Sequence, residues 1–174
     1  MKKGTQIQRQ FKRSCQAAPI TSILKSGEWG NDRCFIIGGG PSLLGFNFDT
    51  LRDEKVIGIN KAFIHYPVDI NYGMDISFFK SVEYSNQYGN SWKDFNGIKL
   101  FLLRSSSEPL NENVYYVRAL PQKTISFDLN KGIYGGPHSG HGALMLALAL
   151  GCKKIGLLGY DFYVTDRTHW HDGY

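Results

Sequence analysis

A run of small residues in the first quarter of the chain has the composition of a phosphate-binding loop. Gly38, Gly39 and Gly40 follow a short apolar run and precede Pro41 and Ser42. Glycines can adopt positive φ angles and let a ligand approach without interference from Cβ atoms. Proline suits the first turn of a helix, whose free N–H groups would then point back towards the loop. The pattern predicts a loop that binds phosphate or a nucleotide, with a plain tight turn as the alternative.

The loop differs from the two best-known nucleotide-binding motifs. A dinucleotide fingerprint needs a third glycine where this chain has Leu43, and an acidic residue after the next strand, where it has Asn60. The Gly-Lys-Ser/Thr sequence of a P-loop is also missing after these glycines. These differences argue against NAD and against ordinary P-loop ATPases. They leave Asn60 and the adjacent Lys61 as candidate nucleotide contacts.

Four of the five histidines lie in two clusters near predicted strand and helix ends, and the second cluster consists of His169 and His171. A histidine at a ligand site can remove the proton of an acceptor hydroxyl. We therefore predict that His169 or His171 is catalytic. Two imidazoles with this spacing could instead bind a divalent metal together with Asp161 or His141. We favour the acid–base role and predict no metal site.

Four further residues are candidate ligand contacts because of their positions at element ends. Ser139 can cap a helix, and with Gly140 it lets the start of that helix approach a ligand. Asp75 follows a predicted strand and could either cap the next turn or contact a ligand or Mg²⁺. Asp161 follows the last predicted strand, where we expect it chiefly to accept hydrogen bonds from loop amides.

Apolar runs predict the strands that must position these residues. The runs lack strict alternation, as is typical of parallel strands that are buried on both faces. The predicted strands are 34–37, 56–59, 68–73, 98–103, 114–117 and 155–158, and the predicted buried helix covers 143–150. We predict a three-layer, Rossmann-like α/β sandwich with a mainly parallel sheet. Strands 34–37 and 155–158 should both be central, and their carboxyl ends should share one crevice.

Less regular segments connect these runs. Residues 81–97 combine aromatic residues with serine, asparagine, glutamine and glycine, and we predict a loop or lid that could hold an acceptor. The stretch 120–136 is predicted to be irregular and on the surface.

The length of 174 residues and the 42% hydrophobic content fit one independently stable domain. Residues 1–27 carry six Lys and Arg and no acid, whereas 28–174 have a net charge of −1. We predict a loosely attached basic arm over 1–27, open to an anionic partner, and a single nucleotide-binding domain over 28–174. Three cysteines are too few for a disulfide framework. Without a visible signal peptide or a long apolar stretch, a cytoplasmic location is expected.

Three separated segments occur in an order that points to a family. They are 36–43, 59–63, and the pair Ser139-Gly140 with 157–163. Together they resemble the bacterial CMP-sialic acid-dependent sialyltransferases and the related MptE-like proteins, which include pterin diphosphokinases. The resemblance covers roughly residues 33–171.

The resemblance assigns roles to particular residues. It implies that Gly38, Gly40, Ser42 and Asn60 hold the nucleotide and that the Ser139-Gly140 pair meets the donor phosphate. It also implies that Tyr163 stabilises the leaving phosphate. The family's base is a histidine at a longer downstream spacing than that of the two histidines near the end of this chain. The chain ends at Tyr174, before the C-terminal portion of a full-length sialyltransferase.

We therefore expect a nucleotide-sugar-dependent glycosyltransferase that needs no metal, with a CMP-sugar as donor and a glycan or other small molecule as acceptor. One alternative is a protein that binds or sequesters a nucleotide without turnover. The other is diphosphoryl transfer from ATP, in which Asp75 or Asp161 would hold Mg²⁺. A homo-oligomer remains open.

Overall fold

A parallel sheet forms the centre of the computed structural model, which describes residues 16–106, 108, 110–111, 113–121, 123–163, 166 and 169–171. Within these ranges the sheet has seven strands in the order β1-β6-β5-β4-β3-β2-β7. The strands are β1 (Ala18–Pro19), β2 (Arg33–Ile37), β3 (Lys55–Ile59), β4 (Ile70–Gly73), β5 (Ile98–Leu103), β6 (Tyr115–Arg118) and β7 (Lys154–Leu158). Every neighbouring pair is parallel.

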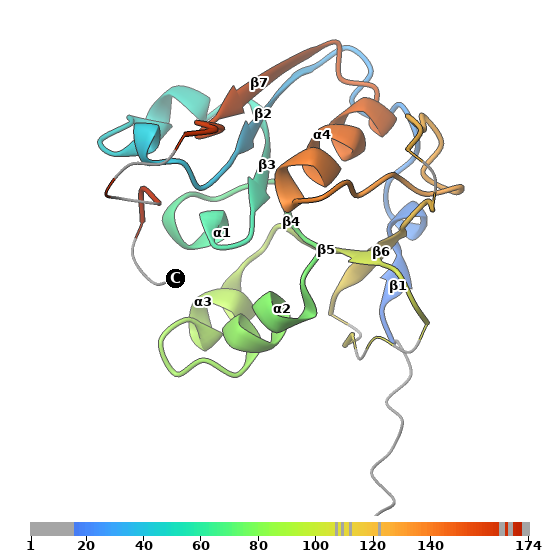
Figure 1. Cartoon of the computed structure of the whole chain (residues 1–174), viewed down its shortest axis with the longest axis horizontal. Coiled ribbons are helices and arrows are strands. Elements are labelled where there is room, and N and C mark those ends of the chain that lie inside the picture. Colours follow the sequence, from blue (N-terminus) through green and yellow to red (C-terminus); the bar gives the residue numbers. More distant parts are fainter. Residues whose placement is uncertain are drawn as a thin grey trace, which may run out of the picture.

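Helices cover both faces of the sheet, which explains the apolar strands. Helix α4 (Ser139–Ala149) covers one face, and α1 (Ala62–His65), α2 (Ile76–Glu83) and α3 (Gly89–Asp94) lie on the other (Figure 1). Successive residues of β2 therefore enter different core clusters, Ile36 beneath α4 and Ile37 on the opposite face. This arrangement confirms the predicted α/β, Rossmann-like fold.

The edge of the sheet differs from the prediction in one respect. β2 and β7 pair in parallel, with Cys34 opposite Ile155 and Ile37 opposite Leu158. β2 is an inner strand, as predicted, but β7 lies at the edge of the sheet. The apolar content of β7 is explained by contacts on its two faces and not by a central position, and Leu157 remains 43% exposed.

Helix α4 begins one residue earlier than the sequence indicates. His138 is its N-cap, and its Nδ1 accepts a hydrogen bond from the His141 N–H at 3.2 Å. Ser139 is thus the first helical residue and not the cap. At the other end, Gly151 has a φ of +86° and stops the helix, as its position predicts.

The segment 81–97 is largely helical and anchored in the core by Val82 and Trp92, and so differs from the predicted loop or lid. It contains the end of α2 and all of α3, and Trp92 is 5% exposed. The Trp92 ring lies 5.0 Å from the Phe63 ring and 5.4 Å from the Phe79 ring, measured between centroids. Polar residues on the outer side of α3 had hidden this burial in the sequence.

Part of the segment predicted as a loosely attached arm packs on the domain. Residues 16–27 pack on the domain: β1 pairs with β6, and Ile20 is 1% exposed in the core beneath α4. Residues 1–15 of the predicted arm lie outside the described residues. No helix in the described ranges is both long enough and apolar enough to cross a membrane.

Candidate functional site

The order of the strands creates a crevice at the carboxyl ends of β2 and β7. From β2 the chain adds β3 to β6 towards one side of the sheet, and β7 then returns to the other side of β2. Ligands of open α/β sheets bind at such a switch point, outside the carboxyl ends of the strands. A cavity of about 490 Å³ opens there, within the range that is usual for small-molecule sites.

Most of the residues that the sequence singled out line this cavity. They are Gly38, Gly39, Gly40, Asn60, Asp75, Ser139, Gly140, Asp161, Tyr163 and His169. Ser42, Lys61 and His171 are not part of its lining. The predicted common crevice of the two strand ends is therefore present, and the structure shows where each side chain lies in or near it.

The glycines of the loop are not needed for a positive φ, which was one of the two predicted reasons for them. Gly40 has a φ of −65°, and neither Gly38 nor Gly39 has a positive φ. What they allow is close contact with the chain after β7. A Cβ atom at Gly38 would lie 2.7 Å from the carbonyl oxygen of Gly159, and one at Gly40 would lie 2.5 Å from Cγ of Asp161.

The carboxylate of Asp161 occupies the place predicted for a phosphate at the start of the next turn. It accepts a hydrogen bond from the Ser42 N–H at 2.8 Å and another from the Ser42 hydroxyl. The turn itself, the 3₁₀ helix η2 (Pro41–Leu43), has only three residues. Asp161 thus binds a loop amide, as expected, and any ligand anion would have to be held by other groups in the cavity.

The first turn of α4 provides such groups. Ser139 and Gly140 line the cavity at the start of an 11-residue helix, where the helix dipole contributes a partial positive charge. The hydroxyl of Tyr160 donates a hydrogen bond to the carbonyl oxygen of Gly140 at 2.9 Å. Burial raises the pKa of Tyr160, so this hydroxyl stays protonated and holds the strand end against the helix. Sequence reasoning gave Tyr160 no role, although it lies in the segment that carries the resemblance.

Asn60 lines the same cavity, and its side-chain oxygen lacks a hydrogen-bond donor among the described residues. Its φ of +53° is in the left-handed region, and its backbone is held by Tyr72 and Asn71: the Asn60 N–H donates to the Tyr72 carbonyl oxygen at 3.0 Å and the Asn60 carbonyl oxygen accepts from Asn71 Nδ2 at 2.9 Å. Its side-chain Oδ1 is buried and accepts no hydrogen bond from any residue that the structure describes. A buried acceptor without a donor is unfavourable. A ligand hydroxyl or amino group could reach this oxygen only if the side chain moved, because the atom is closed to solvent.

Trp170 fixes the position of the histidine cluster. Its N–H donates to the Gly39 carbonyl oxygen at 3.1 Å, and its indole Nε1 donates to the Gly38 carbonyl oxygen at 2.9 Å. Its ring contacts those of Phe48 and His65, with centroids 5.0 and 4.8 Å away. Sequence reasoning missed this role, because the partners of Trp170 are about 130 residues earlier in the chain.

The two candidate catalytic histidines have different surroundings. His169 lines the cavity, and its Cδ2 lies 2.8 Å from where a Cβ of Gly39 would be. Burial, together with the positive charge of Lys61, lowers the pKa of His169. His171 is 8% exposed and its ring stacks on His65, with centroids 5.3 Å apart. Of the two, His169 is therefore the one placed to meet a ligand in the cavity, and Lys61 acts on it electrostatically.

The remaining predictions for the site concern Asp75 and the alternative in which histidine and aspartate side chains hold a metal ion. Asp75 occupies the N-cap position of α2, where its side chain makes no capping hydrogen bond with a described residue, and it lines the cavity. Among the residues with described positions, no group of three or more His, Cys, Asp and Glu side chains is arranged to hold a metal ion.

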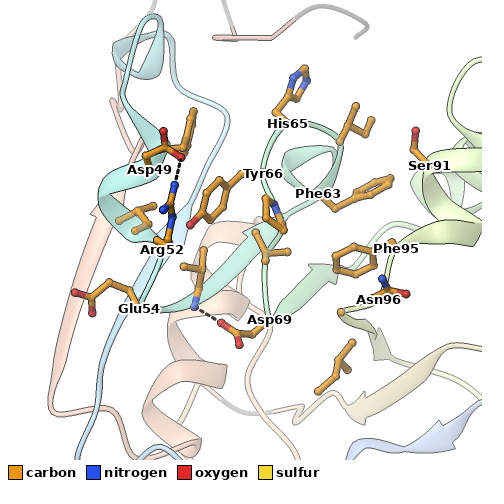
Figure 2. A pocket seen from close by; sticks show the side chains of 18 of the residues that line it. Asp49, Arg52, Glu54, Phe63, His65, Tyr66, Asp69, Ser91, Phe95 and Asn96 are labelled. Atoms are coloured by element: carbon orange, nitrogen blue, oxygen red, sulfur yellow. Dashed lines mark hydrogen bonds and ion pairs between the residues drawn. The ribbon is translucent and has the colours of Figure 1, made fainter.

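A larger cavity, of about 1130 Å³, lies at the amino ends of β3, β4 and β5, the opposite end of the strands from the first cavity. Figure 2 shows two interactions of its charged groups within the protein: Asp49 pairs with Arg52, and Asp69 accepts from the Val56 N–H at 2.8 Å. Glu54 is paired with Arg33. These contacts hold the ends of strands and turns together, so we assign the candidate site to the smaller cavity.

No model of a protein family, no curated protein and no solved structure matches this chain. The likeness to sialyltransferase-like and MptE-like proteins therefore remains a prediction from the three sequence segments.

Proposed function

We propose that this chain is a nucleotide-sugar-dependent glycosyltransferase whose donor binds in the cavity at the carboxyl ends of β2 and β7. One observation carries the proposal: the cavity combines the amino end of α4, the unpartnered Oδ1 of Asn60 and a histidine whose pKa is lowered. A helix N-terminus suits a phosphate, the amide oxygen suits a hydroxyl or amino group, and a neutral histidine suits a general base.

The donor can be placed on these groups. Its phosphate would lie against the N–H groups of Ser139 and Gly140, and the Asn60 amide would accept from the ribose or the base. We propose a CMP-sugar because the resemblance implies one; the exocyclic amino group of cytosine could donate a hydrogen bond to Asn60 Oδ1, as those of adenine and guanine also could.

The transfer step then needs one proton acceptor and one site for negative charge. His169 takes the proton of the acceptor hydroxyl while the oxygen of that hydroxyl bonds to the anomeric carbon of the donor sugar. The bond from the anomeric carbon to the phosphate oxygen breaks. The charge that develops on the phosphate is stabilised by the α4 amides and by the Tyr163 hydroxyl, in the role that the resemblance gives it. The acceptor is a glycan or another small hydroxyl compound, and no metal is required.

A panel of CMP-, UDP- and GDP-sugars, free nucleotides and pterins tests the proposal. Thermal shift with and without Mg²⁺ reports binding, because a ligand that binds only the native state raises the apparent stability. Donor hydrolysis and transfer report turnover. A CMP-sugar that binds and is turned over supports transfer, and binding without turnover supports the sequestering alternative.

His169→Ala and His171→Ala form a matched pair for the chemistry. We expect His169→Ala to lower kcat by about 10²–10⁴-fold with little change in nucleotide affinity. His171→Ala should act chiefly on stability and lower kcat far less, because His171 lies outside the cavity and packs on both His65 and His169. Equal losses of kcat in the two variants would contradict the assignment of the base.

A further inference from the structure

Phe162 combines two features that are rare in one residue. Its φ of +53° is in the left-handed region, which bulky side chains seldom adopt. Its side chain is 82% exposed, more than any other large hydrophobic residue on the described surface. Phe162 also lines the candidate cavity.

The fold gains little from this arrangement. A ring that is mostly exposed buries little apolar surface, so hydrophobic packing does not compensate for the unfavourable backbone. Asn60, the other residue besides glycine with a positive φ in the described chain, also lines the cavity. Backbone strain of this kind is concentrated at ligand sites.

The position of Phe162 indicates which part of a ligand it would contact. Its ring lies 6.1 Å from that of Tyr160, whose hydroxyl is bound to Gly140 in the first turn of α4. Phe162 is therefore on the Tyr160 side of the cavity, separated by the Tyr160 ring from the proposed phosphate site. His169, which must meet the acceptor, lies instead against Gly39 on the wall formed by the glycine loop.

We infer that Phe162 is the stacking platform for the base of the bound nucleotide. The inference rests on the proposed function, and it adds the side chain that holds the planar end of the donor. Its exposed ring offers a flat apolar face to a nucleobase, and stacking of this kind tolerates different bases. Phe162 should therefore contribute to affinity for every nucleotide that the cavity accepts, while Asn60 provides the hydrogen bond that distinguishes among them.

Titration calorimetry with 5′-nucleoside monophosphates tests the inference without involving the sugar or the acceptor. Phe162→Asn should weaken CMP binding by about 5- to 150-fold, the range expected for the loss of one base stack. Phe162→Tyr keeps the aromatic face and should retain affinity within about threefold. Phe127→Asn is the matched control, because Phe127 is 65% exposed and is not part of the cavity lining.

Two further measurements separate stacking from a structural role. Asparagine adopts the left-handed region more readily than phenylalanine, so Phe162→Asn should melt at the same or a higher temperature than the wild type. Inorganic phosphate has no base, and its binding should be the same in all three variants and the wild type. Lost affinity together with unchanged stability would support the platform.

The failure of the inference can be distinguished from that of the proposed function. Unchanged CMP affinity in Phe162→Asn overturns the stacking role, as does a loss that appears only in transfer to an acceptor. A lower melting temperature that accounts for the lost affinity overturns it too. A wild-type chain that binds no nucleotide overturns the proposed function, and the inference with it.

Discussion

The glycine loop shows how the same residues can satisfy different physical requirements. Positive φ, close ligand approach and close contact between chain segments all select glycine, and a sequence does not distinguish among them. The position of the loop was predictable because an apolar run precedes it. Its actual requirement, contact with Gly159 and Asp161, was not, because those residues follow about 120 positions later. The same distance in sequence hid the pairing of Ser42 with Asp161.

Two glycine-to-alanine variants test this account. Gly40→Ala places a Cβ 2.6 Å from the Gly159 carbonyl oxygen, so strand ends must separate. We expect the free energy of unfolding to fall by about 1–3 kcal/mol, as for other overpacked sites. In Gly89→Ala the nearest atom is 3.6 Å away, at the start of α3, and we expect no loss or a gain of up to about 1 kcal/mol. Urea denaturation measures both, and equal effects would contradict the contact account.

The lowered pKa of His169 gives a pH dependence with a defined sign. At pH values below 6.5, the pKa of this imidazole in the unfolded chain, the unfolded chain binds a proton at His169 more readily than the folded chain does. The contribution of His169 to stability is therefore fully present above pH 6.5 and is lost as the pH falls towards the folded pKa. NMR titration of the imidazole checks the pKa.

Lys61→Met removes the nearby charge and should move the His169 pKa upward; a downward shift or none would contradict the electrostatic role of Lys61.

At the scale of elements, apolar runs predicted the strands that face helices on both sides, together with α4. They failed where an element is short or is covered by polar residues. β1 has only two residues, and α3 combines the buried Trp92 with exposed polar neighbours. The prediction placed the N-cap of α4 at Ser139 and not at His138, because serine is a commoner N-cap than histidine. These limits affected element boundaries more than the order of the elements.

The contact between α4 and β4 provides a prediction at this scale. A Cβ at Gly142 would lie 2.1 Å from the Tyr72 hydroxyl, which is buried and makes no hydrogen bond within the described part of the chain. Gly142→Ala should therefore lower the free energy of unfolding by about 1–3 kcal/mol. Tyr72→Phe removes an unsatisfied buried hydroxyl and should be neutral or stabilising.

The double variant shows whether these two effects arise from one contact. Without the Tyr72 hydroxyl, the added methyl group at Gly142 has more room, so Gly142→Ala should cost less in the Tyr72→Phe background. Chemical denaturation of the four proteins gives the coupling free energy. Strict additivity would mean that α4 tilts away from β4 to accept the methyl group, and that the hydroxyl does not set their distance.

For the whole molecule, the site depends on contacts that are distant in sequence. The glycine loop, α4 and the 169–171 segment meet because β7 lies next to β2. The apolar run 155–158 predicted this strand and its share in the crevice, but at the centre of the sheet and not at its edge. Trp170 connects the glycine loop to α1, because its indole donates a hydrogen bond to Gly38 and its ring contacts His65. A sequence indicates that a tryptophan will find an apolar partner, but it does not specify which carbonyl groups its N–H groups will meet.

Trp170 variants test whether this contact positions the base. Trp170→Ala removes the indole hydrogen bond and the packing on Phe48 and His65, and we expect it to lower the free energy of unfolding by about 2–4 kcal/mol. Trp170→Phe keeps an aromatic ring and should cost about 1 kcal/mol, the value of one hydrogen bond. Because His169 is the adjacent residue, kcat should fall in Trp170→Ala by more than nucleotide affinity does. Tyr84→Ala is the control, since Tyr84 is 66% exposed and is not part of the cavity lining, and both quantities should be unchanged. If Trp170→Ala weakens nucleotide binding but leaves kcat intact at saturation, the segment holds the ligand and does not position the base.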